Sequence, residues 1–333
     1  MKFLLKTAVA TVALIILAIA GASMAGSQPA AGEKPSVELT RDQVQEIVLR
    51  SYQYVAMYNV NNKFAMDPNN PMSTGGWNRV RANTTLADHT LEALARPNND
   101  TLYVAAMLDL RAEPVILEAP AFDSIYVSLT ASGYDHYVSV LLSTRLGDFS
   151  KPSRVLFYTK RTTGYSGEPV DGIDKVVEMS GDFIEVTYRV MPHLNDPARL
   201  QRNLDAMRAI KVKTLSEYKS VNDAKTHFAP WVSPSGISTN LDEKRANAEF
   251  PEFGQTDFDV FENNLLEVMQ FVFNHTTFDP SNELNRRLIE VYKPLGVAPG
   301  RSYDPTRVAD IDGALFREVA ESTASRQLAR MND

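Results

Sequence analysis

The densest group of residues that could do chemistry is the run Arg-Pro-Asn-Asn-Asp-Thr-Leu-Tyr at Arg96–Tyr103. It offers a guanidinium, two carboxamides, a carboxylate, a hydroxyl and a phenol. A guanidinium presents its donors in a fixed fork that suits carboxylate or phosphate groups. We therefore predict that this segment binds a small polar or anionic molecule, with Arg96 as the charged anchor. The other candidate ligand-binding residues of the segment are Asn98, Asn99, Asp100 and Tyr103.

The same segment also has a purely structural interpretation. Asn and Asp side chains beside a proline hydrogen bond to nearby backbone groups and build turns. A turn of this kind leading into a strand needs the same residues and no ligand. The sequence leaves both interpretations open.

Two histidines complete the candidate ligand-binding set. His89 lies shortly before the segment, and His136 lies in Tyr134-Asp135-His136-Tyr137 at the start of a predicted strand. Together with Asp100 they could serve a cofactor-free or metal-assisted hydrolase. Adjacent residues on an extended chain point to opposite faces, so Asp135 is not expected to orient His136. No spacing requires a metal, so no metal ligand is predicted and the cofactor stays open.

Composition and missing motifs narrow the function classes. The chain has no cysteine, which excludes disulfides, thiol nucleophiles and thiolate metal sites. Its formal net charge of −7 argues against nucleic acid as a partner, because such proteins carry a basic stripe. The G-x-S-x-G, H-E-x-x-H, P-loop and G-x-G-x-x-G patterns are missing. A small-molecule binding protein, a hydrolase and a structural envelope protein remain, and the oligomeric state is open.

Periodicity predicts the elements that position these residues. Thr40 and Gln43 form a predicted capping box, and a helix continues to about Tyr58. The stretch from Asn59 to Asn99 is rich in Asn, Pro and Gly and is predicted to be mostly loop, with room for one short helical turn. From Thr101 the apolar period changes to two, and strands are predicted at 102–108, 125–129, 138–142, 154–160, 175–179 and 183–190. The expected fold class is α+β, an antiparallel β-sandwich flanked by N-terminal and C-terminal helices.

The C-terminal part is predicted to be helical. Three Asp-Pro pairs, beginning at Asp196, Asp279 and Asp304, have the form of helix starts, and a further helix is predicted at 256–273. The expected organisation is a signal peptide at 1–25, a disordered lead at 26–38, a domain with helix and sandwich at 39–220, an irregular connection at 221–255 and a helical region at 256–333.

The Arg96–Tyr103 string followed by Leu108-Asp109-Leu110-Arg111-Ala112-Glu113-Pro114 resembles the signature of the family catalogued as domain of unknown function 1254. Arg161-Thr162-Thr163-Gly164 is a weaker local match, and the resemblance covers roughly Val44 to Tyr218. It implies a β-sandwich with accompanying helices and brings no established reaction.

The region after Leu295 resembles the connector that leads, in longer family members, into a domain of unknown function 1214. The sequence ends at Asp333 without that domain, which leaves open any activity that depends on it.

The N-terminus has the pattern of a cleavable secretory signal. Lys2 and Lys6 form a basic region, an apolar run follows from about Thr7 to Ala20, and small residues end it. The apolar run is shorter than the roughly 20 residues of a membrane-spanning helix. The sequence therefore predicts export to the periplasm, with no stable membrane span after cleavage.

Export is tested by N-terminal sequencing of the protein from the native cell envelope. We expect the mature chain to begin at Ser23 or Gly26, because Ala20 and Ala22, or Ser23 and Ala25, supply the small residues before the cleavage point. A soluble cytosolic product that retains Met1 would contradict the prediction.

Overall fold

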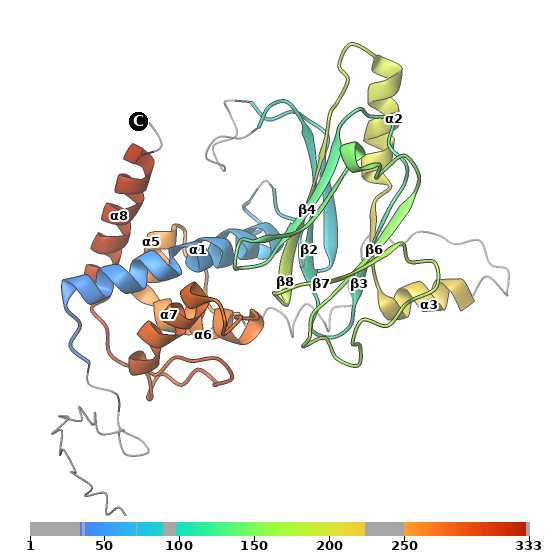
Figure 1. The fold of residues 1–333 in the computed structure, drawn as a ribbon. Helices are drawn as coiled ribbons and strands as arrows, with labels where there is room; N and C mark the ends of the chain where they lie inside the picture. Colours follow the sequence, from blue (N-terminus) through green and yellow to red (C-terminus); the bar gives the residue numbers. More distant parts are fainter. Residues whose placement is uncertain (1–33, 35–36, 71, 89–97, 224–249, 331–333) are drawn as a thin grey trace, which may run out of the picture.

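A computed structural model of the chain describes residues 34, 37–70, 72–88, 98–223 and 250–330. The predicted signal peptide lies outside these residues, and so do the candidate residues His89 and Arg96. The described part forms two packed β-sheets beside a layer of helices (Figure 1). The predicted α+β class with flanking helices is confirmed.

The larger sheet has five antiparallel strands. Its order is β1 (Arg79–Asn83), β2 (Leu102–Asp109), β8 (Phe183–Val190), β4 (Val127–Ser132) and β5 (Val138–Ser143). Within this sheet Tyr103 pairs with Arg189, which pairs in turn with Ser128. The register brings the start of β2 to the end of β8, and the end of β2 to the start of β8.

The smaller sheet has four strands in the order β7 (Lys175–Glu178), β6 (Ser153–Tyr158), β3 (Val115–Ala119) and β9 (Lys211–Thr214). The β6–β7 pair is parallel, whereas the other pairs are antiparallel, so the sandwich is mixed. Side chains of both sheets form the core between them, with Val104, Leu129 and Tyr188 from one sheet and Leu117 and Phe157 from the other.

The helices divide into two groups. Helix α1 (Arg41–Met66) packs with α5 (Asp257–Asn263), α6 (Leu265–His275), α7 (Glu283–Tyr292) and α8 (Gly313–Arg330) in one layer (Figure 1). Helices α2 (Pro197–Arg208) and α3 (Leu215–Asp223) accompany the sandwich, with single 3-10 turns at Thr144–Leu146 and Lys293–Leu295. The core of the helical layer also includes Met107, Tyr134 and Phe183 of the sandwich.

Helix α1 is longer than predicted. It continues through the Asn-rich segment to Met66, because that segment is buried against the neighbouring helices. The side chain of Asn59 donates to Asp257 of α5, and that of Asn62 donates to the hydroxyl of Tyr134 in the sandwich. Tertiary contacts of this kind outweigh the low helix propensity of Asn. The prediction that 59–99 is mostly loop was therefore wrong for the part of α1 at 59–66 and for β1.

The Asp-Pro prediction holds at one of three places. Asp196 caps α2 by accepting from the backbone N–H of Arg199. Asp279 and Asp304 instead close short turns, accepting from the N–H groups of Ser281 and Thr306. Helices α7 and α8 begin later, at Glu283 and Gly313, and the helix predicted at 256–273 is divided at Asn264.

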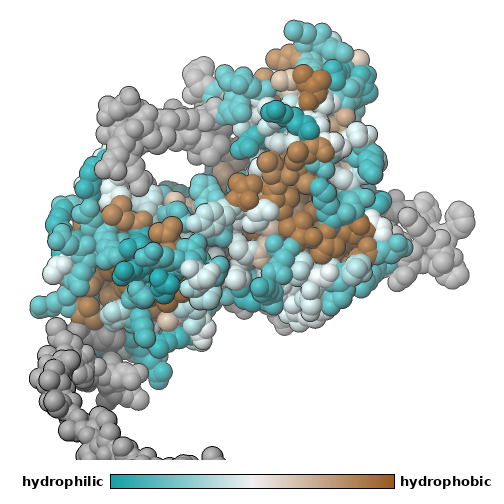
Figure 2. Space-filling model, in the orientation of Figure 1, coloured by the Kyte–Doolittle hydropathy of each residue, from teal (hydrophilic) through white to brown (hydrophobic). Residues whose placement is uncertain are grey.

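The sandwich leaves part of its apolar surface exposed. Figure 2 shows apolar surface gathered mainly over the strands, with a mostly hydrophilic surface over the helices. Large exposed apolar side chains of the sandwich include Ile125, Val138, Leu141, Leu146 and Val176. Within the described ranges, no helix combines the length and the apolar character needed to cross a bilayer.

Candidate functional site

The sandwich and the helical layer are joined where the loop before β8 meets the end of α6. Gly181 forms a β-bridge with Thr276. The N–H of Asp182 donates to the carbonyl oxygen of His275 at 2.9 Å, and the N–H of Thr277 donates to the carbonyl oxygen of Ser180 at 2.7 Å. We call this region, residues 180–182 and 275–277, the junction.

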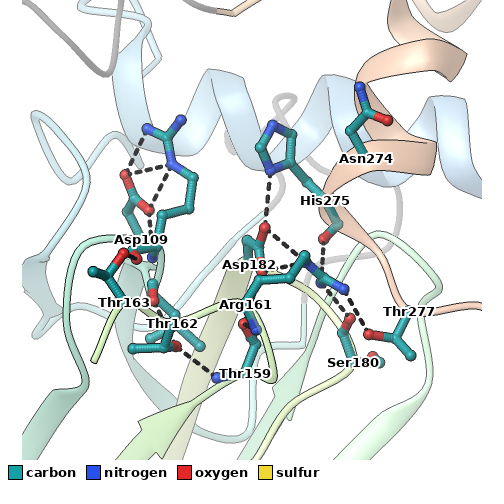
Figure 3. A network of polar contacts seen from close by, with 12 residues as sticks. Asp109, Thr159, Arg161, Thr162, Thr163, Ser180, Asp182, Asn274, His275 and Thr277 are labelled. Carbon is teal, nitrogen blue, oxygen red and sulfur yellow. Dashed lines mark hydrogen bonds and ion pairs between the residues drawn. The ribbon is translucent and has the colours of Figure 1, made fainter. Parts of the chain in front are cut away.

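Asp182 is the centre of a polar network at the junction (Figure 3). Its carboxylate is 2% exposed and accepts from Thr159 Oγ1, Arg161 Nε and His275 Nδ1, each at 2.9 Å. Burial alone would raise its pKa. The hydrogen bonds from His275, Arg161 and Thr159 outweigh that effect and hold the pKa of Asp182 below its usual value.

Arg161 uses its guanidinium to bind both sides of the junction. Besides its contact with Asp182, it donates to Thr277 Oγ1 at 2.7 Å and to the carbonyl oxygens of Ser180 and His275 at 3.0 and 3.1 Å. A guanidinium is suited to this role because its donors are rigidly arranged. The network therefore fixes the end of α6 against the sandwich.

His275 has the first feature of a general base, a carboxylate on Nδ1. Because ionised Asp182 can only accept, Nδ1 carries a proton, and a neutral imidazole in this position would have its lone pair on Nε2. Among the described residues, however, no hydroxyl is hydrogen bonded to Nε2, so a nucleophile for the imidazole is missing there. The ring packs against Phe183 and Phe271, with centroids 5.2 and 4.4 Å away. These contacts indicate a structural role.

Two adjoining hollows open beside the junction, and both are lined by Tyr54 of α1 and Tyr137 of the β4–β5 connection. We call them together the junction cleft. The larger hollow has a volume of about 570 Å³ and lies between α1 and α7, with Leu49, Leu284 and Leu288 in its lining. The smaller hollow has a volume of about 210 Å³ and reaches the junction at Thr276 and Thr277.

The inner end of the cleft is polar. Asp135 lines the smaller hollow and is 7% exposed, with its carboxylate accepting from Ser180 Oγ at 2.6 Å and from the N–H of Tyr137 at 3.2 Å. Burial raises the pKa of Asp135, and these hydrogen bonds and the nearby His136 offset only part of that effect. Thr276 lines the same hollow, is 4% exposed, and has no hydrogen-bond partner for Oγ1.

The ionisable groups of the cleft are mainly acidic. Asp42 and Glu46 line the larger hollow, and Asp135 and Asp279 line the smaller one. The guanidinium in the lining, that of Arg50, is paired with Glu46 at 2.8 Å. This balance favours a neutral or cationic ligand over an anion.

The structure separates the residues that the sequence nominates. His89 and Arg96 lie outside the described residues. Asn98, Asn99 and Asp100 are exposed, and the Asn98 side chain accepts from the N–H of Asp100 at 2.6 Å, which is the predicted turn geometry. Tyr103 is half-buried on β2, 5.8 Å below the guanidinium carbon of Arg189.

His136 lies at the other end of the same sheet. It is exposed, with φ at 61°, in the connection that follows Ser132. Ser128 lies in register with Arg189, which pairs with Tyr103. Ser132 is four residues further along β4, about 13 Å from Ser128 by the rise of a strand. Asp100 and His136 therefore do not share a site. Within the described ranges, no cluster of three potential metal ligands occurs.

Sequence reasoning missed the residues that build the junction cleft. Asp135 was considered only as a partner for His136, whereas it faces Ser180 and the cleft. Tyr54 is one more core position in the helical period of α1. A local signal for Asp135 was present in the sequence, because an Asp in a Gly-Tyr-Asp-His segment favours a turn at the end of a strand.

Comparison with known proteins supports the fold and finds a family match over part of the chain. Residues 77–213 match the family described as "Protein of unknown function (DUF1254)". No protein with a curated description matches the chain. The crystal structure of the VPA0106 protein from Vibrio parahaemolyticus is similar, with a TM-score of 0.56 and 20% identity over 87% of this chain. The match spans 59% of that protein.

A weaker likeness, with a TM-score of 0.28 and 15% identity, joins 58% of this chain to 50% of an uncharacterized protein from Burkholderia cenocepacia.

The junction network predicts the effect of Asp182→Asn. The variant loses the charge shared by Arg161 and His275, and breaking a buried pair of this kind should lower the free energy of unfolding by about 3 kcal/mol at pH 7. Because the pKa of Asp182 is lowered, its contribution is present above the unfolded pKa, close to 4, and is lost as the pH falls through the folded pKa.

Urea unfolding at pH 7 and in acid tests this prediction, and the difference from the wild type should shrink in acid. Asp205→Asn on the exposed surface of α2 is the matched control and should change stability by less than about 0.5 kcal/mol. An Asp182→Asn protein as stable as this control at pH 7 would refute the structural role.

The stability contribution of Asp135 should change with pH in the opposite direction to that of Asp182. Its raised pKa means that the folded protein loses stability as the pH rises through that pKa. Asn has the same shape and retains hydrogen bonds to Ser180 and the Tyr137 N–H, so Asp135→Asn should gain stability relative to the wild type between acid and neutral pH. Melting temperatures of both proteins across this range measure the effect. A difference that does not vary with pH would contradict it.

Proposed function

We propose that this protein, which carries a DUF1254 domain at residues 77–213, is an exported binding protein that holds a small amphipathic molecule in the junction cleft. One observation carries the proposal. The buried Asp135 carboxylate and the unpartnered Thr276 hydroxyl line the same hollow, and that hollow adjoins a larger one whose mixed lining includes Leu49, Leu284 and Leu288.

The polar end suits a head group that donates hydrogen bonds. The carboxylate of Asp135 has accepting capacity beyond its bonds to Ser180 and Tyr137, and Thr276 Oγ1 has no partner at all. A buried polar group without a partner costs free energy that a ligand donor recovers. A primary amine fits best, since it offers several donors and a positive charge, and a hydroxyl is the neutral alternative.

The larger hollow suits the apolar body of such a molecule. Leu49 and Leu284 are 51% and 63% exposed, and Tyr137 is 52% exposed, so apolar surface faces the cleft without a protein partner among the described residues. Its volume of about 570 Å³ falls within the usual range for small-molecule sites. Burying these side chains under a ligand would contribute affinity by removing them from water.

The other functions predicted from the sequence stand differently. The acidic lining disfavours an anion in the cleft, so the anionic molecule predicted near Arg96–Tyr103 belongs elsewhere. A hydrolase that combines Asp100 with His136 is not supported, because these residues lie at opposite ends of the sheet. Export rests on the N-terminal sequence pattern and on the test given for it.

Three probes with one ring and different head groups test the proposal. Benzylamine, benzyl alcohol and benzoate are added separately at pH 7, and the melting temperature is measured at constant ionic strength. We expect benzylamine to stabilise most and benzyl alcohol less, and benzoate should stabilise no more than acetate at the same concentration, which carries a carboxylate without the ring. In Asp135→Asn the affinity for benzylamine should fall about tenfold, as expected for one lost charge-assisted hydrogen bond.

Asp205→Asn is again the matched control and should keep the response of the wild type to all three probes. Equal stabilisation by the three probes would show that the cleft does not select the head group. An absence of any response at millimolar probe concentration, or an unchanged affinity for benzylamine in Asp135→Asn, would reject the proposed site.

A further inference from the structure

The outer face of the larger sheet carries a second polar group of residues, at the end where β2 begins. Tyr103, Arg189 and Ser128 lie side by side on β2, β8 and β4. Residues in register on neighbouring strands share a face, and their sequence neighbours Leu102, Val104 and Tyr188 are buried in the core between the sheets. The row of Tyr103, Arg189 and Ser128 therefore points away from the core.

Arg189 lacks a counter-ion on this face. Its guanidinium carbon lies 5.8 Å from the centroid of the Tyr103 ring, and among the described residues it makes no ion pair. The acid on the same face of β8 is Glu185, four residues away or about 13 Å, and it is hydrogen bonded to Thr187. Asp148, beside Ser143, is paired with Lys175. Arg189 is nonetheless half-buried.

Hydroxyl side chains occupy the strand positions next to Arg189 on this face. Ser128 is 4% exposed, and its Oγ lies 3.2 Å from the phenol oxygen of Tyr126. Ser143, in register with Ser128, is 8% exposed. Thr101, directly before β2, is 5% exposed, and its Oγ1 has no hydrogen-bond partner. An unpartnered buried hydroxyl two residues from Tyr103, the register partner of an arginine without a counter-ion, is a feature that a ligand would explain.

We propose that Arg189 is the anchor of a second binding site, which holds the oxyanion group of a small molecule, a carboxylate or a phosphate. The guanidinium fork matches such a group with two parallel hydrogen bonds. The Tyr103 ring supports the plane of the guanidinium, as aromatic faces do for arginine. The hydroxyls of Thr101, Tyr126 and Ser128 supply further donors to the oxygens that the fork leaves free.

This site is independent of the junction cleft. It lies at the other end of the sheet and has the opposite charge preference. It adjoins the Arg96–Tyr103 segment, and Tyr103 is common to the predicted and the proposed site. The anchor differs, because the structure assigns that role to Arg189, a residue that the sequence pattern did not single out.

Titration with sodium acetate and with inorganic phosphate tests the site, against sodium chloride at the same ionic strength. We expect at least one of the two oxyanions to raise the melting temperature of the full chain, whereas chloride does not. Arg189→Lys keeps the charge and loses the fork, so its affinity should fall about tenfold, and Arg189→Gln should abolish the effect. The two anions distinguish a carboxylate ligand from a phosphate ligand.

Arg208→Gln on α2 is the control, because Arg208 is exposed and loosely paired with Asp205 at 3.4 Å. It should bind as the wild type does. Amide chemical shifts of the wild-type protein give a measurement that needs no variant, and they should move at Tyr103, Ser128 and Arg189 during the titration. Shifts confined to other regions, binding retained in Arg189→Gln, or no binding of either oxyanion would each overturn the proposal.

Discussion

The contact on which the arrangement depends is the one between Arg161 and Asp182. It lies where two separate cores meet, one between the sheets and one among the helices. Packing alone would let α6 slide along the sandwich, since apolar contacts have no preferred direction. Arg161 removes that freedom by donating to Asp182, Thr277 and the carbonyl oxygens of Ser180 and His275. The position of Thr276 beside Asp135, and hence the polar end of the cleft, follows from this network.

Much of the fold was predictable because its signals are local. The alternating runs at β2 and β8 and the Thr40–Gln43 capping box match the structure, and the run predicted at 125–129 overlaps β4. Errors arose where tertiary contacts overrode local preference. The Asn-rich turns of α1 are helical because they are buried, and β3 (Val115–Ala119) begins with three consecutive buried apolar residues, so it shows no clear alternation. Asp279 and Asp304 close short turns, although each is followed by proline as Asp196 is at the start of α2. The Asp-Pro pair alone therefore could not distinguish a helix start from a turn.

The candidate sites were less predictable, because each combines residues that are distant in sequence. The cleft joins Tyr54, Asp135 and Thr276, and the oxyanion site joins Tyr103, Ser128 and Arg189. The eight-residue string at Arg96–Tyr103 shares only Tyr103 with the proposed oxyanion site, because chemical variety within a string says nothing about register. Only the pairing of β2 with β8 brings Arg189 over Tyr103. The Asn98 turn shows that part of the same string has a structural use.

Asp135 and Asp182 show how two buried carboxylates close to one another differ in role. Both are less than a tenth exposed, and both contact the loop at 180–182 or belong to it. Asp182 has an arginine, a histidine and a threonine around it, and its pKa is lowered. Asp135 has neutral donors and a pKa that burial raises, so its charge is held at a cost to folding. A positively charged donor bound in the cleft would lower the pKa of Asp135, as Arg161 helps to do for Asp182. The carboxylate that lacks a charged partner is thus the one that lines the cleft, where a ligand can reach it.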